Sequence, residues 1–158
     1  MRILFVCLGN ICRSPTAEGV MRHKLREAGL ADDVDVESAG TGGWHLGHAP
    51  DERASAAAGA RGITLESRAQ RFLAEHADEF DLICAMDRQN EADIRALAPA
   101  AEGKLHLLRE FDPAAVEAGD LEVPDPYHGG DSGFEDVLDM VERACDGLVE
   151  EIRARVGR

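Results

Sequence analysis

The chain has 158 residues, of which 44% are hydrophobic and 30% charged, a balance typical of one globular domain, predicted here to span residues 1–158. Acidic residues outnumber basic ones by 31 to 17, giving a net charge of −14, which argues against nucleic acid and membranes as partners because both attract basic surfaces. No apolar stretch is long enough to cross a bilayer, and four cysteines without a secretory signal indicate reduced thiols in the cytoplasm.

The chain begins with a predicted strand, a short loop and a helix. The apolar run 3–6 predicts a buried strand that ends at Cys7. Ser14 is a suitable N-cap and Pro15 suits the first helical position, so a helix is predicted from this point. Gly29 is expected to end that helix.

A second strand and a second helix follow. Alternating apolar residues predict a strand at 34–38, and a glycine-rich loop comes after it at 40–47. The alanine-rich segment 51–61 predicts a helix that Gly62 closes.

The second half of the chain continues the alternation. We predict a strand at 81–86, a helix at 87–98 and a fourth strand at 104–108. A long irregular stretch at 109–131 follows, and loops of that length in small domains are usually functional or disordered. A capping box at 132–135 then begins an amphipathic helix that runs to the carboxyl end.

This order of elements predicts an α/β fold. Strands that alternate with helices form right-handed βαβ units, so we expect a four-stranded parallel sheet with helices on both faces. Ligands of such sheets bind beyond the carboxyl ends of the strands. The loop between the first strand and the first helix is therefore the expected site.

That loop has the composition of an anion-binding cradle. It lies in segment 7–15, with a cysteine at the strand end and an arginine six positions later. If the loop curls, its N–H groups and those of the first helical turn point inward and favour a negatively charged ligand. Gly9 and Asn10 tolerate the left-handed conformations that such a curl needs. We therefore expect a phosphate loop between strand 1 and helix 1.

The same loop supplies a nucleophile. Its positive potential stabilises a thiolate at Cys7, which should therefore be reactive at neutral pH. Arg13 can grip two phosphoryl oxygens with its planar fork and stabilise their charge in the transition state. The Ser14 hydroxyl can donate to the sulfur and make it a better leaving group. The alternative is a buried strand-end cysteine and a surface arginine, but the position between a strand and a helix start favours catalysis.

A leaving alkoxide or phenoxide also needs a proton. The candidate donor is Asp125, because Pro124 and Pro126 stiffen the backbone around it within the long loop. Taken alone, Pro-Asp-Pro is an ordinary turn. Together with the Cys7 loop it favours a general acid.

With these motifs the sequence resembles the low-molecular-weight protein tyrosine phosphatases over essentially its whole length. Segment 6–15 resembles the phosphate loop of that family, and 125–127 resembles its acid loop. Segments 38–41 and 86–90 also fit the family pattern. Two specific motifs in the right order, about 110 residues apart, make coincidence an inadequate explanation.

The resemblance implies a mechanism with a phosphocysteine intermediate. Cys7 would be the nucleophile and Arg13 the phosphate-binding residue. Asp125 would be the general acid and then the base that activates water. No metal and no cofactor are implied. The phosphoryl group is expected to bind against the loop residues Leu8, Gly9, Asn10, Ile11, Cys12 and Ser14.

The resemblance also implies a supporting network. Asn10, Ser14 and Ser38 match residues that hold the loop and the thiolate in the family, and Asp87 matches an acidic position near the arginine. One position departs from the family, because Ser67 stands where many members carry a histidine. A hydroxyl can donate but cannot become cationic, so we expect weaker tuning of the loop without loss of activity.

The pocket walls are expected to be flat side chains. We predict Trp44 and His45 on one side and Tyr127 and His128 on the other. Such walls beside a deep cradle suit phosphotyrosine, which reaches farther than phosphoserine. The alternative is a Trp44 in the core, but two preceding glycines and polar neighbours favour exposure.

The other thiols have simpler interpretations. Cys12 is either a space-filling residue or a redox partner that forms a reversible disulfide with oxidised Cys7, and the resemblance favours the redox partner. Cys84 and Cys145 lie on apolar faces and are predicted to be core residues.

Three other functions compete with tyrosine phosphatase activity. An arsenate reductase of this fold needs two further neighbouring cysteines, and Cys84 has no such neighbour. A protein-arginine phosphatase tends to carry threonine at the position of Ile11. A silent phosphotyrosine-binding module or redox sensor is disfavoured by the complete set of Cys7, Arg13 and Asp125.

The expected partners are phosphotyrosine-containing proteins, together with a tyrosine kinase and its targets. Tyr127 is the only tyrosine in the chain, so a kinase that regulates this protein through tyrosine would have to modify it. We expect a monomer or a weak dimer.

Overall fold

The computed structural model describes residues 1–126 and 131–157, with the side chains of Asp131 and Ser132 left out. The strands are β1 (Arg2–Cys7), β2 (Asp35–Gly40), β3 (Leu82–Ala85) and β4 (Leu105–Leu107). The helices are α1 (Arg13–Ala28), α2 (Glu52–Gly59), α3 (His76–Glu79), α4 (Arg88–Leu97), α5 (Pro113–Ala118) and α6 (Asp131–Val156). Two short 3₁₀ helices, η1 (Pro99–Ala101) and η2 (Leu108–Phe111), flank β4.

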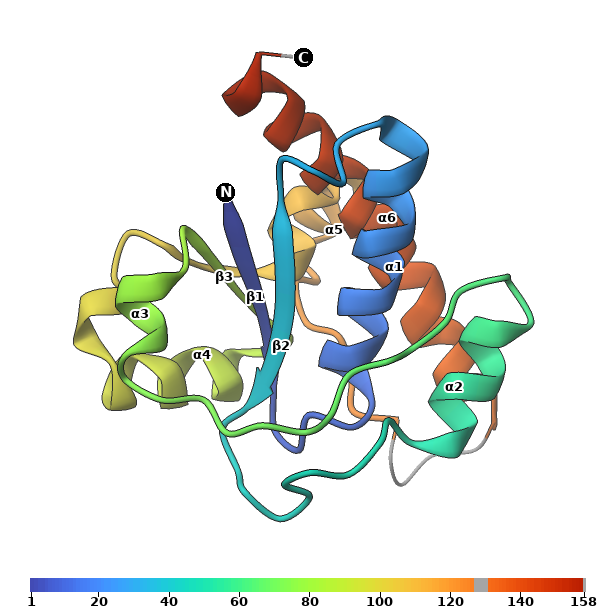
Figure 1. The fold of residues 1–158 in the computed structure, drawn as a ribbon, viewed down its shortest axis with the longest axis horizontal. Helices are drawn as coiled ribbons and strands as arrows, with labels where there is room; N and C mark the ends of the chain where they lie inside the picture. Colours follow the sequence, from blue (N-terminus) through green and yellow to red (C-terminus); the bar gives the residue numbers. More distant parts are fainter. Residues whose placement is uncertain (127–130, 158) are drawn as a thin grey trace.

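The four strands form one parallel sheet in the order β2-β1-β3-β4, as the sequence predicts. Helices α1 and α6 cover one face, and α3 and α4 cover the other (Figure 1). Alternate residues of β1 supply the two cores: Ile3 and Phe5 pack on the α1 and α6 side, whereas Leu4 and Val6 pack on the opposite side. Because β1 is buried on both faces, its sequence is a continuous apolar run.

The carboxyl ends of β1 and β2 hold their two following loops side by side. Cys7 is paired with Gly40 in the parallel register, and the Thr41 and Gly42 amides donate to the Cys7 and Leu8 carbonyls. A Cβ at Gly40 would lie 2.7 Å from the Leu8 carbonyl oxygen, so only glycine allows this approach. The loop after β2 thus supports the loop after β1.

Helix α1 does not begin as predicted. It begins at Arg13 with Cys12 in the N-cap position, and no side chain caps it. Ser14 lies inside the helix because its hydroxyl contacts the Cys7 sulfur instead of a backbone amide. Because no side chain caps the helix, the N–H groups of Arg13 and Ser14 in its first turn remain available to a ligand. The predicted end at Gly29 is correct, since this residue adopts a left-handed conformation.

The stretch 109–131 is more regular than predicted, because it contains α5. Asp112 caps this helix by accepting from the Ala114 amide, and Pro113 occupies its first turn. That start signal is local and was visible in the sequence. Helix α6 begins at Asp131, one residue before the predicted capping box, whose Ser132 side chain lies outside the described set.

Within the described residues, no helix is long and apolar enough to span a membrane.

Candidate active site

The loop from Cys7 to Arg13 is curled, and one residue makes the curl possible. Asn10 has φ of 56°, the only positive value at a described residue other than glycine. Its side chain holds this conformation at both ends: Nδ2 donates to Ser14 Oγ at 2.7 Å, and Oδ1 accepts from the Gln70 amide at 2.9 Å. Gly9, predicted to share the left-handed conformation, does not adopt it.

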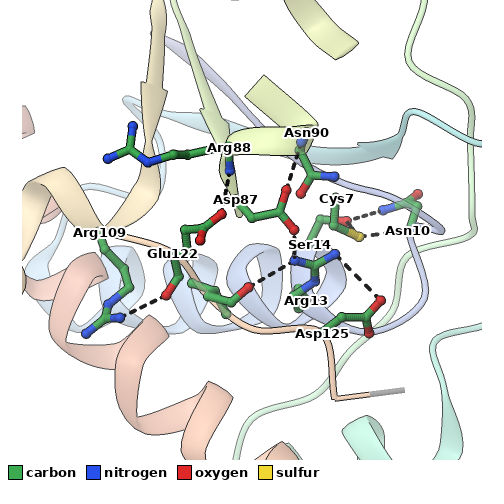
Figure 2. A network of polar contacts seen from close by, with 11 residues as sticks. Cys7, Asn10, Arg13, Ser14, Asp87, Arg88, Asn90, Arg109, Glu122 and Asp125 are labelled. Atoms are coloured by element: carbon green, nitrogen blue, oxygen red, sulfur yellow. Dashed lines mark hydrogen bonds and ion pairs between the residues drawn. The ribbon is translucent and has the colours of Figure 1, made fainter. Parts of the chain in front are cut away.

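The Cys7 sulfur lies at the floor of the curl and is almost fully buried. It is 3.2 Å from the Asn10 amide nitrogen, which donates to it, and 3.0 Å from Ser14 Oγ. Asn10 already donates to Ser14 Oγ, so the hydroxyl hydrogen points at an acceptor, and the sulfur at 3.0 Å is nearer than the Ala39 carbonyl at 3.4 Å (Figure 2). A thiolate at Cys7 therefore receives two hydrogen bonds.

Arg13 lines the same pocket as Cys7, and two hydrogen bonds fix its guanidinium. Its Nη1 donates to Asp87 Oδ2 at 2.7 Å and to the Val123 carbonyl at 2.9 Å. Burial alone would lower the pKa of Arg13, but Cys7 and the Asp87 carboxylate together raise it above its ordinary value. The guanidinium is thus a fixed cation at the base of the pocket (Figure 2).

Asp125 approaches from the far end of the chain. Its Oδ2 lies 3.8 Å from Arg13 Nη2, and its side chain is 42% exposed. Asp125 therefore lies at the rim, whereas Cys7 lies at the floor. The pocket between them measures about 170 Å³ and is lined by Cys7, Leu8, Gly9, Ile11, Cys12, Arg13, Trp44, His45 and Asp125.

The match to known families is decisive. The model of the low molecular weight phosphotyrosine protein phosphatase family matches residues 2–158. The chain belongs to this family. The match confirms the predicted family and enzyme class.

Related proteins agree with this assignment along almost the full length. A low molecular weight protein-tyrosine-phosphatase of Streptomyces coelicolor is 46% identical over 98% of this chain and 95% of its own. A crystal structure of an Entamoeba histolytica protein tyrosine phosphatase, with Hepes in its active site, superposes with a TM-score of 0.90 at 35% identity, covering 99% and 98% of the two chains. Drosophila arginine phosphatase superposes with a TM-score of 0.88 at 27% identity, covering 97% and 98%.

The family's supporting network is only partly formed by the predicted residues. Ser38 Oγ donates to Glu18 Oε1 at 2.8 Å, whereas the described hydrogen-bond partners of the Cys7 sulfur are Asn10 and Ser14. Gln70, which was not among the predicted site residues, links Asn10 to Ser38: its amide donates to Asn10 Oδ1 at 2.9 Å, and its Nε2 donates to the Ser38 carbonyl at 2.8 Å. No local motif marks Gln70, because its role depends on a loop crossing from another part of the chain.

Ser67 does not replace the family histidine as a donor. Its Oγ is buried and has no hydrogen-bond partner among the described residues. Glu18, in α1, is buried as well, and burial raises its pKa although Ser38 and Arg22 oppose the shift. This phosphatase therefore holds its loop through Asn10 and Gln70 rather than through a histidine.

Cys12 lines the same pocket as Cys7. Burial first, and then the charges of Asp51 and Cys7, raise the pKa of Cys12 to about 12. Cys12 is therefore a protonated thiol at neutral pH.

One predicted wall of the pocket is described and the other is not. Trp44 is 71% exposed at the pocket mouth, so a core position is excluded, and His45 lies beside it. Tyr127 and His128 fall outside the described residues.

Proposed function

We propose that this chain hydrolyses phosphotyrosine in proteins through a phosphocysteine intermediate. Cys7 is the nucleophile, Arg13 binds the phosphoryl group, and Asp125 is the general acid and then the base. The observation that carries the proposal is that the Arg13 guanidinium, 3.8 Å from the Asp125 carboxylate, lines the same pocket as the buried Cys7.

In the first step the Cys7 thiolate attacks phosphorus in line with the ester oxygen. The sulfur–phosphorus bond forms, the phosphorus–oxygen bond breaks, and Asp125 gives its proton to the leaving phenoxide. Arg13 and the loop N–H groups stabilise the charge on the remaining oxygens. Arg13 needs no reorganisation to do so, because Asp87 and the Val123 carbonyl already orient it.

In the second step water attacks the phosphorus and Asp125 takes its proton. The sulfur–phosphorus bond breaks, and the thiolate leaves with the bonding pair. The Asn10 amide and the Ser14 hydroxyl, both within 3.2 Å of the sulfur, stabilise the departing anion.

Pocket depth favours phosphotyrosine. Cys7 is 3% exposed, whereas Trp44 at the mouth is 71% exposed. An aromatic ring is long enough to place its phosphate on the floor while packing against the indole. We propose tyrosine-phosphorylated proteins of the cytoplasm as substrates, and a tyrosine kinase as the enzyme that produces them. All four cysteines are free thiols, which fits a reducing compartment.

Phosphoarginine is the second candidate substrate, because an arginine phosphatase has nearly the same fold. Ile11 lines the pocket where such enzymes tend to carry threonine, and this favours phosphotyrosine. Arsenate reduction has less support: Cys84 is fully buried within β3, and burial raises its pKa well above the ordinary value.

A comparison of substrates tests the proposal. The protein should hydrolyse a phosphotyrosine peptide and p-nitrophenyl phosphate in the presence of a chelator, and Cys7→Ser should abolish both reactions. Cys145→Ala, which removes a thiol from the core, is the matched control and should remain active. Faster hydrolysis of phosphoarginine than of phosphotyrosine would favour the second candidate. Binding of phosphotyrosine without turnover would indicate a silent module.

A further inference from the structure

The segment from Asp120 to Val123 leads directly to Asp125, and a buried arginine holds it. Arg109 belongs to η2, and its side chain is only 7% exposed. Its Nη1 donates to the Glu122 carbonyl at 2.8 Å and lies 3.2 Å from Asp120 Oδ2. One guanidinium therefore holds both the backbone of this segment, at Glu122 (Figure 2), and the side chain of Asp120.

Three further contacts attach the same segment to the rest of the site. The Arg88 amide donates to Glu122 Oε2 at 2.9 Å. The Val123 amide donates to the Met86 carbonyl at 2.8 Å, and the Val123 carbonyl accepts from Arg13. The segment thus lies between Arg109 on one side and the end of β3 with the Arg13 guanidinium on the other (Figure 2).

The 3₁₀ helix η2, which carries Arg109, packs tightly against α6. Helix α6 passes so close to η2 that a Cβ at Gly147 would overlap the Phe111 carbonyl. Burying an arginine is favourable only when its donors find partners, and Arg109 Nε has none among the described residues. The described polar contacts of this guanidinium are therefore with the segment from Asp120 to Val123.

We infer that Arg109 is a positioning residue for the general acid. Only Pro124 separates Val123 from Asp125, and proline locks its own φ, so a shift of the segment passes to the Asp125 carboxyl. A displacement of about 1 Å at a reacting group lowers rates by about a hundredfold. The inference rests on the proposed function, because it assigns to Arg109 the placement of the proton donor.

The test compares leaving groups. Phenoxide needs the proton of Asp125, whereas p-nitrophenoxide leaves readily without it. For Arg109→Met, kcat/KM should fall about tenfold or more with phenyl phosphate and less than about threefold with p-nitrophenyl phosphate. Arg109→Lys keeps a cation that can reach one of the two partners, so it should recover part of the loss. An equal fractional loss on both substrates would overturn the inference.

Two controls separate this inference from general instability and from the proposed function. Ile152→Val removes a buried methylene near the carboxyl end of α6, at a residue that does not line the pocket, and should leave the ratio of the two kcat/KM values unchanged. In an Asp125→Ala background, Arg109→Met should cause no further loss specific to phenyl phosphate. If Asp125→Ala itself shows no leaving-group effect, the proposed acid is wrong. If it shows the effect and Arg109→Met does not, only the role of Arg109 is wrong.

Discussion

Asp87 binds two parts of the molecule with its two carboxylate oxygens. Its Oδ2 lies 2.7 Å from Arg13 Nη1, and its Oδ1 accepts from the Asn90 amide at 2.8 Å, capping α4 (Figure 2). The residue that begins α4 therefore also orients the phosphate-binding arginine. Because the two functions use different oxygens, two substitutions can separate them.

Asp87→Asn should lower activity more than stability. An asparagine is an equally good N-cap, but it removes the negative charge that orients Arg13, so kcat/KM should fall by about tenfold with little change in Tm. Asp87→Ala should lower activity and also cost about 1 kcal/mol of helix capping. Enzyme kinetics and thermal unfolding of both variants check this. Equal Tm values for the two variants would show that the cap contributes nothing.

Glycine should be able to adopt the backbone conformation of Asn10 but cannot replace its side-chain hydrogen bonds. Asn10→Gly keeps access to φ of 56° and loses the contacts with Ser14 and Gln70. Asn10→Ala loses the contacts and adds a backbone strain of about 1–2 kcal/mol. Both variants should lose activity, and only the alanine variant should show the additional loss of stability in denaturant unfolding. Full activity of Asn10→Gly would show that the side chain is dispensable.

The two thiols of the pocket should react with iodoacetamide at very different rates. With a pKa of about 12, only about one Cys12 in a thousand is a thiolate at pH 9. Alkylation between pH 7 and 9 should therefore modify Cys7 alone, and inorganic phosphate should slow it. Peptide mapping by mass spectrometry identifies the modified residue. Modification of Cys12 first would contradict the assigned roles of the two thiols.

Buried Glu18 should make stability depend on pH. Burial raises the pKa of Glu18 above its ordinary value of 4.5, so the folded state binds its proton more tightly than the unfolded state does. The contribution of Glu18 protonation to the free energy of unfolding is then fully favourable below this ordinary pKa, and it is lost as pH rises through the raised pKa. The Tm of Glu18→Gln minus the Tm of the native protein should therefore increase as pH rises from about 4 to 7. A Tm difference that stays constant or falls over this range would contradict the account.

Local signals predicted the framework well. The apolar run before Cys7 and the end of α1 at Gly29 depend on neighbouring residues, so they can be found in the sequence. Ser14 shows where this logic fails. Its preference for an N-cap is outweighed by a contact with the Cys7 sulfur, which only the folded loop creates.

The supporting residues of the site were harder to predict. Gln70 and Arg109 carry no motif, and each acts on backbone groups from a distant part of the chain. Their roles depend on which segments, distant in the sequence, lie next to each other in the fold, and the packing around the sheet decides this. Glu18 shows the same limit, because its helical position indicates nothing about its contact with Ser38.

The most direct test of the account is to trap the covalent intermediate. Asp125→Ala lacks the base that activates water, so a phosphorylated enzyme should accumulate when this variant reacts with p-nitrophenyl phosphate and is quenched rapidly in acid. Mass spectrometry of the digested protein should place one phosphoryl group on Cys7, and the additional Cys7→Ser substitution should abolish it. A phosphoryl group on another residue, or turnover by Cys7→Ser at the native rate, would contradict the proposed mechanism.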